Sequence, residues 1–132
     1  MYVSLVTYGT SLCPSHACLF SPTVLHVYGD PYSMGFAHGQ LLKGQINTTI
    51  PAFYQHVLQE VDNEIDFLPK EIRDLISKYG LGGALDLTYE LTKEHIPSYF
   101  IEELQGLAEG SGVDYQLLLR VHMLPELTKV SS

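Results

Sequence analysis

The stretch EELQGLAEGSGVDY, residues 102–115, organises the helices of this chain. It contains most of a helix that Pro97 opens and that we expect over residues 99–109. The Gly-Ser-Gly step at 110–112 closes that helix, because glycine readily adopts the backbone conformation in which helices end. Asp114 is then the expected N-cap of a final helix. That helix has an apolar run of Leu117, Leu118, Leu119 and Val121, and Pro125 ends or kinks it.

Toward the N-terminus, apolar residues recur at helical spacing in two long segments. The first has Ser33 as its predicted cap, and its apolar residues are Met34, Ala37, Leu41, Leu42 and Ile46. The second is expected to start at Pro51, where a missing N–H does no harm. Its apolar stripe is Phe53, Val57, Leu58 and Val61. An acidic break over residues 62–66 follows.

Two shorter helices are expected between these segments and Pro97. Pro69 opens a helix that contains Ile72, Leu75 and Ile76 and that ends at Gly80. Gly82 and Gly83 then form a flexible joint, and residues 85–91 are helical again, with Tyr89 near the apolar face. The sum is about six short helices, so the chain is predicted to be mainly α.

One strand is expected, at Thr23–Tyr28, where β-branched residues precede the turn Gly29-Asp30-Pro31. A lone strand has nothing to pair with, and its backbone groups need partners. The pattern therefore favours the helical layer of a larger sandwich, whose sheet comes from elsewhere, over a self-contained helical domain.

Length and composition set broad limits on function. A chain of 132 residues with 45% hydrophobic content is one domain with a real core. The net charge of −8 disfavours nucleic acid and anionic membrane surfaces as partners, since both need a basic face. No apolar run approaches the roughly 18 residues that a transmembrane helix needs.

The first 28 residues are expected to be a tail or an atypical signal-like segment, because the first charge is Asp30 and no Lys or Arg precedes it. Cys13 and Cys18 either form a small disulfide loop or stay unpaired, and His16 alone adds too few ligands for a metal. The acceptor triplet at Asn47 gives weak support for a lysosomal or secreted protein, with a cytoplasmic location as the alternative.

The remaining polar patterns favour structural explanations. Gly35 and Gly39 lie four residues apart, so they share a helix face that lets another backbone approach closely. His38 between them is expected to be packed or solvated rather than a catalytic base. Glu102 and Glu109 share a face and are expected to be solvated. No histidine pair has zinc spacing, so we expect no metal and no cofactor.

Four motifs resemble the upstream part of self-cleaving N-terminal-nucleophile amidohydrolases, the branch that includes penicillin acyltransferase-like, acid ceramidase-like and phospholipase B-like proteins. The motifs are residues 29–42, 97–112, 102–115 and 124–129. The resemblance covers residues 29–132, which it implies are the helical, α-subunit-like domain of an αββα sandwich. It implies a downstream β chain of the same precursor as partner, and an acyl-amide or lipid-amide as substrate.

The resemblance also implies three catalytic positions. In such proteins the precursor cuts itself before a nucleophile, usually cysteine, whose freed α-amine then acts as base. Either the nucleophile follows Ser132, or Ser131 or Ser132 occupies its place. Glu126 corresponds to a glutamate that, in acid ceramidase-like proteins, helps to order the active site a few residues before the nucleophile. A solvent-facing carboxylate after Pro125 is an equally favoured interpretation.

The expected function is thus the upstream part of a self-cleaving amide hydrolase or acyltransferase that is inactive alone. The alternative is a helical interaction or regulatory module without enzymatic activity. Leu118, Met123 and Leu124 are expected to line the acyl pocket, with core packing as the alternative for at least one of them.

Overall fold

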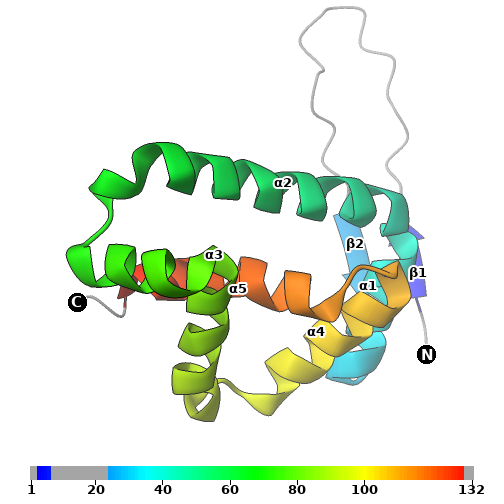
Figure 1. Ribbon diagram of the computed structural model, residues 1–132. Helices are drawn as coiled ribbons and strands as arrows, with labels where there is room; N and C mark the ends of the chain where they lie inside the picture. The colour runs from blue at the N-terminus through cyan, green and yellow to red at the C-terminus, as the bar shows by residue number, and fades with distance from the viewer. Residues whose placement is uncertain (1–2, 7–23, 130–132) are drawn as a thin grey trace, which may run out of the picture.

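The structure, a computed structural model, describes residues 3–6 and 24–129. The described part is mainly helical, as the sequence predicts, with a two-stranded sheet at one end (Figure 1). The elements follow in the order β1 (Val3–Val6), β2 (Val24–Val27), α1 (Pro31–Leu41), α2 (Lys43–Glu64), η1 (Ile65–Phe67), α3 (Lys70–Thr92), η2 (Lys93–His95), α4 (Ser98–Ser111) and α5 (Tyr115–Lys129).

The strand predicted over residues 23–28 is present as β2, but the expectation that it has no partner in the chain is wrong. It pairs antiparallel with β1, so that Val3 lies opposite Val27 and Val6 opposite Val24. The partner strand comes from the segment that was expected to be a tail. Four residues are too short a run to separate a strand from a signal-like apolar segment by sequence pattern.

Helices α1 and α4 touch through their backbones, and four glycines make this contact possible. A Cβ built on Gly35 would lie 1.9 Å from the carbonyl oxygen of Glu103, and one on Gly106 would lie 2.0 Å from that of Tyr32. A Cβ on Gly39 would lie 2.5 Å from the carbonyl oxygen of Leu107, and one on Gly110 would lie 2.1 Å from that of Phe36. The structural interpretation of the glycine pair in α1 is therefore confirmed, and its partner pair in α4 shows why the spacing is needed.

Helix α1 begins earlier than its apolar pattern predicts. The N-cap is Asp30 rather than Ser33, and the backbone N–H of Ser33 donates to Asp30 Oδ1 at 3.0 Å. Pro31, in the first turn, has the φ angle of a helix already fixed, which favours this earlier start. Hydrogen bonds from Ser33 lower the pKa of the Asp30 carboxyl group.

The predicted helix start at Pro51 is wrong, because α2 runs through this residue without ending. Apolar side chains keep one helical spacing on both sides of the proline and pack against the same core: Ile46, Ile50, Tyr54, Val57, Leu58 and Val61. Tyr54, not Phe53, faces inward: Phe53 is 45% exposed, whereas Tyr54 is 8% exposed. Continuous burial thus outweighs the hydrogen bond that Pro51 removes.

Helix α3 is kinked at Gly80, where the sequence predicted a helix end. Gly80 has φ 72° and ψ 168°, a conformation open to glycine alone, and the helix resumes at Leu81 in a new direction (Figure 1). The predicted flexible joint at Gly82 and Gly83 is wrong, because both lie inside the second helical half.

The core lies where α2, α3, α4 and α5 meet. Leu85 and Leu118 are fully buried at its centre. The other buried apolar residues of this cluster are Tyr54, Ile72, Ile76, Leu81, Ala84, Leu104, Ala108, Val113, Leu119, Met123 and Leu127. None of the helices in residues 24–129 is long and apolar enough to cross a lipid bilayer.

Candidate functional site

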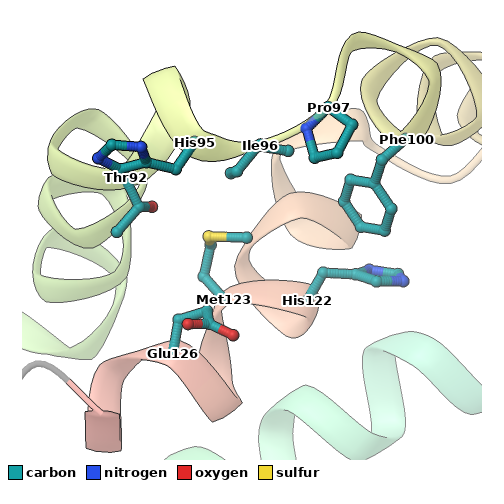
Figure 2. Close-up of a pocket in the computed structure, with 8 residues that line it drawn as sticks. All are labelled: Thr92, His95, Ile96, Pro97, Phe100, His122, Met123 and Glu126. Carbon is teal, nitrogen blue, oxygen red and sulfur yellow. The ribbon is translucent and has the colours of Figure 1, made fainter.

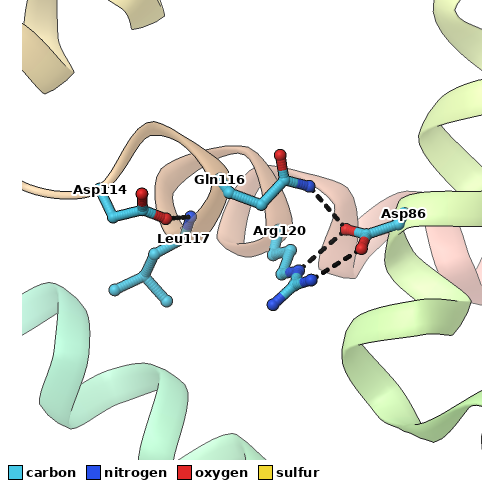
Figure 3. Close-up of polar contacts among 5 residues, drawn as sticks. All are labelled: Asp86, Asp114, Gln116, Leu117 and Arg120. Carbon is cyan, nitrogen blue, oxygen red and sulfur yellow. Dashed lines mark hydrogen bonds and ion pairs between the residues drawn. The ribbon is translucent and has the colours of Figure 1, made fainter.

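Helix α5 carries the residues that the sequence singled out, and a cap holds its first turn. Asp114 Oδ2 accepts a hydrogen bond from the backbone N–H of Leu117 at 2.9 Å, which confirms Asp114 as the N-cap (Figure 3). Upstream, Gly112 ends α4 with a φ of 77°, as the Gly-Ser-Gly pattern predicts. The turn between α4 and α5 is therefore well defined, and it fixes where α5 starts.

An ion pair fastens the middle of α5 to α3. Arg120 donates two hydrogen bonds to Asp86, from Nε to Oδ1 at 2.8 Å and from Nη2 to Oδ2 at 2.7 Å (Figure 3). Gln116, one turn earlier, donates to the same carboxylate at 2.7 Å. Such pairing through two parallel hydrogen bonds fixes the relative orientation of the two side chains as well as their separation. The contact lowers the pKa of Asp86, mainly through Arg120, and raises that of Arg120.

A glycine makes room for this ion pair. A Cβ on Gly82 would lie 3.2 Å from the guanidinium carbon of Arg120 and 3.5 Å from the hydroxyl of Tyr54. Gly82 thus allows the guanidinium to lie against α3. The sequence analysis missed the roles of Asp86 and Arg120, because residues 34 positions apart on two helices give no spacing signal.

A cavity of about 580 Å³ lies beside the second half of α5. Its walls come from the end of α3, the α3–α4 connection, the start of α4 and α5 (Figure 2). The lining residues are Thr92, His95, Ile96, Pro97, Phe100, His122, Met123 and Glu126. This volume falls in the range of small-molecule sites, and the lining combines apolar walls with a few polar groups.

Two of the sequence-predicted positions line this cavity. Glu126 lies on the α5 wall, and Met123 lies beside it with its sulfur directed toward the α3–α4 connection (Figure 2). Leu118 does not line the cavity but is fully buried in the core, which is the core packing expected for at least one of the three apolar residues. Leu124 is half-buried and packs against the core. Ser131 and Ser132 lie outside the described residues.

His122 stands between this cavity and a smaller one. The second cavity, of about 170 Å³, is lined by His38, Phe100, Glu103, Leu104, Leu107 and His122. Phe100 and His122 border both, and their rings meet edge to face at 5.5 Å and 70°. His122 Nδ1 lies 2.8 Å from the carbonyl oxygen of Leu118. Because a carbonyl only accepts, Nδ1 carries a hydrogen in this contact.

The other predicted polar groups have structural or solvent-exposed positions. His38 is half-buried and reaches only the smaller cavity. Glu102 is exposed, as expected, and exposed Glu109 accepts a hydrogen bond from the hydroxyl of Tyr32, which raises the pKa of that tyrosine. No group of three or more His, Cys, Asp or Glu side chains among residues 24–129 could hold a metal ion.

Asn47, the predicted glycosylation acceptor, is used in helix packing. Its Nδ2 donates to the carbonyl oxygen of Ser111 at 2.7 Å and to that of Lys43 at 2.8 Å. The first bond satisfies a carbonyl in the last turn of α4, where the helix itself offers no partner. A glycan on Nδ2 would displace one of these hydrogen bonds, so this asparagine gives no support for a secreted or lysosomal location.

Curated proteins from two organisms are similar to this chain. Protein dcd1A of Dictyostelium discoideum is 43% identical over 112 residues, which are 82% of this chain and 25% of that protein. Protein dcd1B of the same organism is 41% identical over 114 residues, 83% of this chain and 23% of that protein. A protein of Archaeoglobus fulgidus described as uncharacterized is 31% identical over 108 residues, 76% of this chain and 16% of that protein.

The chain therefore spans about a quarter or less of the length of these relatives. No family model matches the chain, and no solved structure matches it.

Proposed function

We propose that this chain is the upstream part of a self-cleaving N-terminal-nucleophile amide hydrolase or acyltransferase. The observation that carries the proposal is the cavity beside α5, because Glu126 and Met123 both line it close to the end of that helix. The expected cleavage junction follows in the sequence, directly before Ser131, directly before Ser132 or directly after Ser132. An acyl chain would pack against Ile96, Phe100 and Met123, and the cut bond would lie near Glu126.

The arrangement of the resembling motifs supports the proposal. Residues 29–42 form the cap and body of α1, and residues 97–112 form α4 with its flanking turns. These two segments pack backbone against backbone through their glycines. Motifs that lie far apart in the sequence thus contact each other. This contact holds α4 in place, and α4 forms one wall of each cavity.

The surface and the small sheet support a covering partner. Leu91, Tyr99 and Tyr28 are 66%, 59% and 61% exposed. A two-stranded sheet is marginal without further strands. We infer that a downstream β chain of the same precursor continues the sheet and covers some of these exposed side chains.

In the proposed mature enzyme, the first residue of the downstream chain supplies both nucleophile and base. Its α-amine has an ordinary pKa near ~8, so it accepts a proton near neutral pH. The substrate would be a linear amide with an apolar acyl group, since the cavity walls are largely apolar. The 132-residue chain alone is expected to hydrolyse no amide, because the proposal assigns the sandwich sheet and the oxyanion donors to the downstream chain.

The test uses the longer protein in which this chain is followed by its downstream part. Intact-mass measurement over time should show two fragments whose masses sum to the precursor plus one water. Glu126→Gln should slow their appearance about 10-fold or more, whereas Glu102→Gln, on the exposed face of α4, should not. Alanine at Ser131 or at Ser132 would stop cleavage if that residue is the nucleophile.

A single precursor mass under every condition, including acidification, would overturn the proposal. It would favour the alternative, a helical interaction module that uses the exposed apolar residues to bind a partner.

A further inference from the structure

The larger cavity beside α5 has a polar end and an apolar end (Figure 2). Thr92 and His95 approach the polar end from α3 and η2, and Glu126 lies on the α5 wall at the same end. Pro97 and Phe100 lie toward the other end. A ligand that matches both ends is an amphiphile, with an apolar chain and a single polar head.

The polar groups of this cavity offer hydrogen-bond acceptors more than donors. Thr92 Oγ1 already donates to the carbonyl oxygen of Thr88 at 2.8 Å, so toward a ligand this hydroxyl can only accept. His122 uses its Nδ1 donor in the contact with the Leu118 carbonyl oxygen. Glu126 has an interaction within the chain, but a carboxylate has about four acceptor sites, which leaves capacity for a ligand.

The charges around the cavity favour a cationic head over an anionic one. The lining that the structure describes includes one carboxylate and no lysine or arginine. The imidazole side chain is ordinarily neutral above about pH 7, so the two lining histidines add no fixed positive charge there. The whole chain has a net charge of −8, which adds to the preference. A carboxylate or phosphate head would find no fixed cation in this cavity, whereas an ammonium head would find Glu126.

We propose that this cavity binds an amphiphile with one apolar chain and a protonated amine. The ammonium group donates hydrogen bonds to the Glu126 carboxylate and to Thr92 Oγ1. The apolar chain lies against Ile96, Phe100 and Met123, in a volume of about 580 Å³ that suits a small molecule. The 132-residue chain itself is the binder, so the inference goes beyond the proposed function and needs no cleavage.

The experiment compares three ligands that share one tail: octylammonium, octanol and octanoate. Calorimetric titration of the 132-residue chain near pH 7.5 should show octylammonium binding about 10-fold or more tightly than octanol, because hydrogen bonds between charged groups are the stronger ones. Octanoate should bind more weakly than octanol, because its charge is repelled by Glu126. Octanoate binding as tight as that of octylammonium would overturn the proposal.

Methionine methyl resonances locate the ligand in the same protein. Met123 lines the cavity, whereas Met34 lies on α1 and does not line it. Octylammonium should therefore shift the NMR signal of the Met123 methyl group and leave that of Met34 in place. Octylammonium binding that leaves the Met123 signal unshifted would place the ligand elsewhere and overturn the proposal.

Glu126→Gln removes the charge of this side chain and nearly keeps its size. It should weaken octylammonium binding about 10-fold or more and leave octanol binding unchanged, which also shows that the variant is folded. The matched control is Glu102→Gln, an exposed position on α4 outside the cavity, which should stay within about 2-fold of wild type.

Equal losses in Glu126→Gln and Glu102→Gln would mean that net charge alone attracts the amine, and would overturn the role of the cavity. If Glu126→Gln fails to fold, the three ligands and the Met123 signal of the wild-type chain still decide. Absence of self-cleavage in the longer protein would overturn the proposed function and leave this binding in place.

Discussion

The Arg120–Asp86 pair shows how single residues fix the geometry beside the cavity. Both side chains are about one-third exposed, so solvent reduces the energy of the pair below that of a buried one. The pair matters mainly for the orientation of α5, because Gln116 and Arg120, on two successive turns of that helix, both donate hydrogen bonds to the Asp86 carboxylate. The pair thereby sets how α5 lies against α3.

The Asp86 carboxylate should make the stability of the wild-type protein depend on pH, and its removal should abolish that contribution. Asp86→Asn is expected to lower the free energy of unfolding by about 1–2 kcal/mol at pH 7. The folded pKa of Asp86 is lowered below an unfolded value near ~3.9, so this contribution is complete above about pH 4 and is lost as pH falls through the folded pKa. Urea unfolding of both proteins between pH 2.5 and 7 measures the difference.

The control is Asp74→Asn, an exposed position on the same helix. It should stay within about 0.5 kcal/mol of wild type across the range. A destabilisation of Asp86→Asn that persists unchanged at pH 2.5 would contradict the electrostatic explanation.

The sequence predicted Glu126 and Met123 but not His122, Asp86 or Arg120. Glu126 was found through a linear motif, which a single sequence displays, and Met123 was found as an apolar residue near the expected junction. The cavity around His122 depends on Phe100 from α4 and Thr92 from α3, and which residues meet across three helices is a tertiary property. A histidine followed four residues later by a glutamate on one helix face is the signal that was available.

At the scale of elements, the contact between α1 and α4 depends on the absence of side chains. Gly35→Ala should destabilise the fold by about 3 kcal/mol or more, because its Cβ would occupy the space of the Glu103 carbonyl and force the helices apart. Gly44→Ala on α2 is the matched control, since nothing lies within 4 Å of its Cβ. It should stabilise by up to about 1 kcal/mol.

Thermal or urea unfolding of the two variants would decide the matter. A Gly35→Ala protein as stable as wild type would show that α1 and α4 adjust their separation without cost. The proposed role of this contact in shaping the cavities would then fail.

Helix existence was predictable, whereas several boundaries were not. Pro51 reads equally as a first helical residue and as an interior one, and only the unbroken apolar spacing from Ile46 to Val61 separates the two. Gly80 was correctly identified as a break because positive φ excludes other residues. Strand β1 was missed because its partner lies about twenty residues away along the chain.

For the molecule as a whole, stability should be concentrated in the helical core. Backbone amides around Leu104, Leu118 and Leu119 are expected to exchange hydrogen most slowly, because these residues are at most 3% exposed. Amides of β2 should exchange much faster, since Val24 and His26 are exposed and the described sheet has only two strands. Hydrogen exchange followed by mass spectrometry on the 132-residue chain tests this.

The same measurement on the longer protein should show added protection at β2 if a downstream chain extends the sheet. Equal exchange in both proteins would contradict that arrangement. Protection of β2 that already matches the core in the short chain would show that the hairpin is stable by itself.

Helix α5 continues for nine residues beyond Arg120, to Lys129, and burial of Met123 and Leu127 holds this half against the core. The ion pair at Arg120 and these two buried residues together fix the direction of the C-terminal half of α5. If the proposed self-cleavage occurs, substitution of Asp86 on α3 should therefore slow it by changing how the C-terminal half of α5 lies.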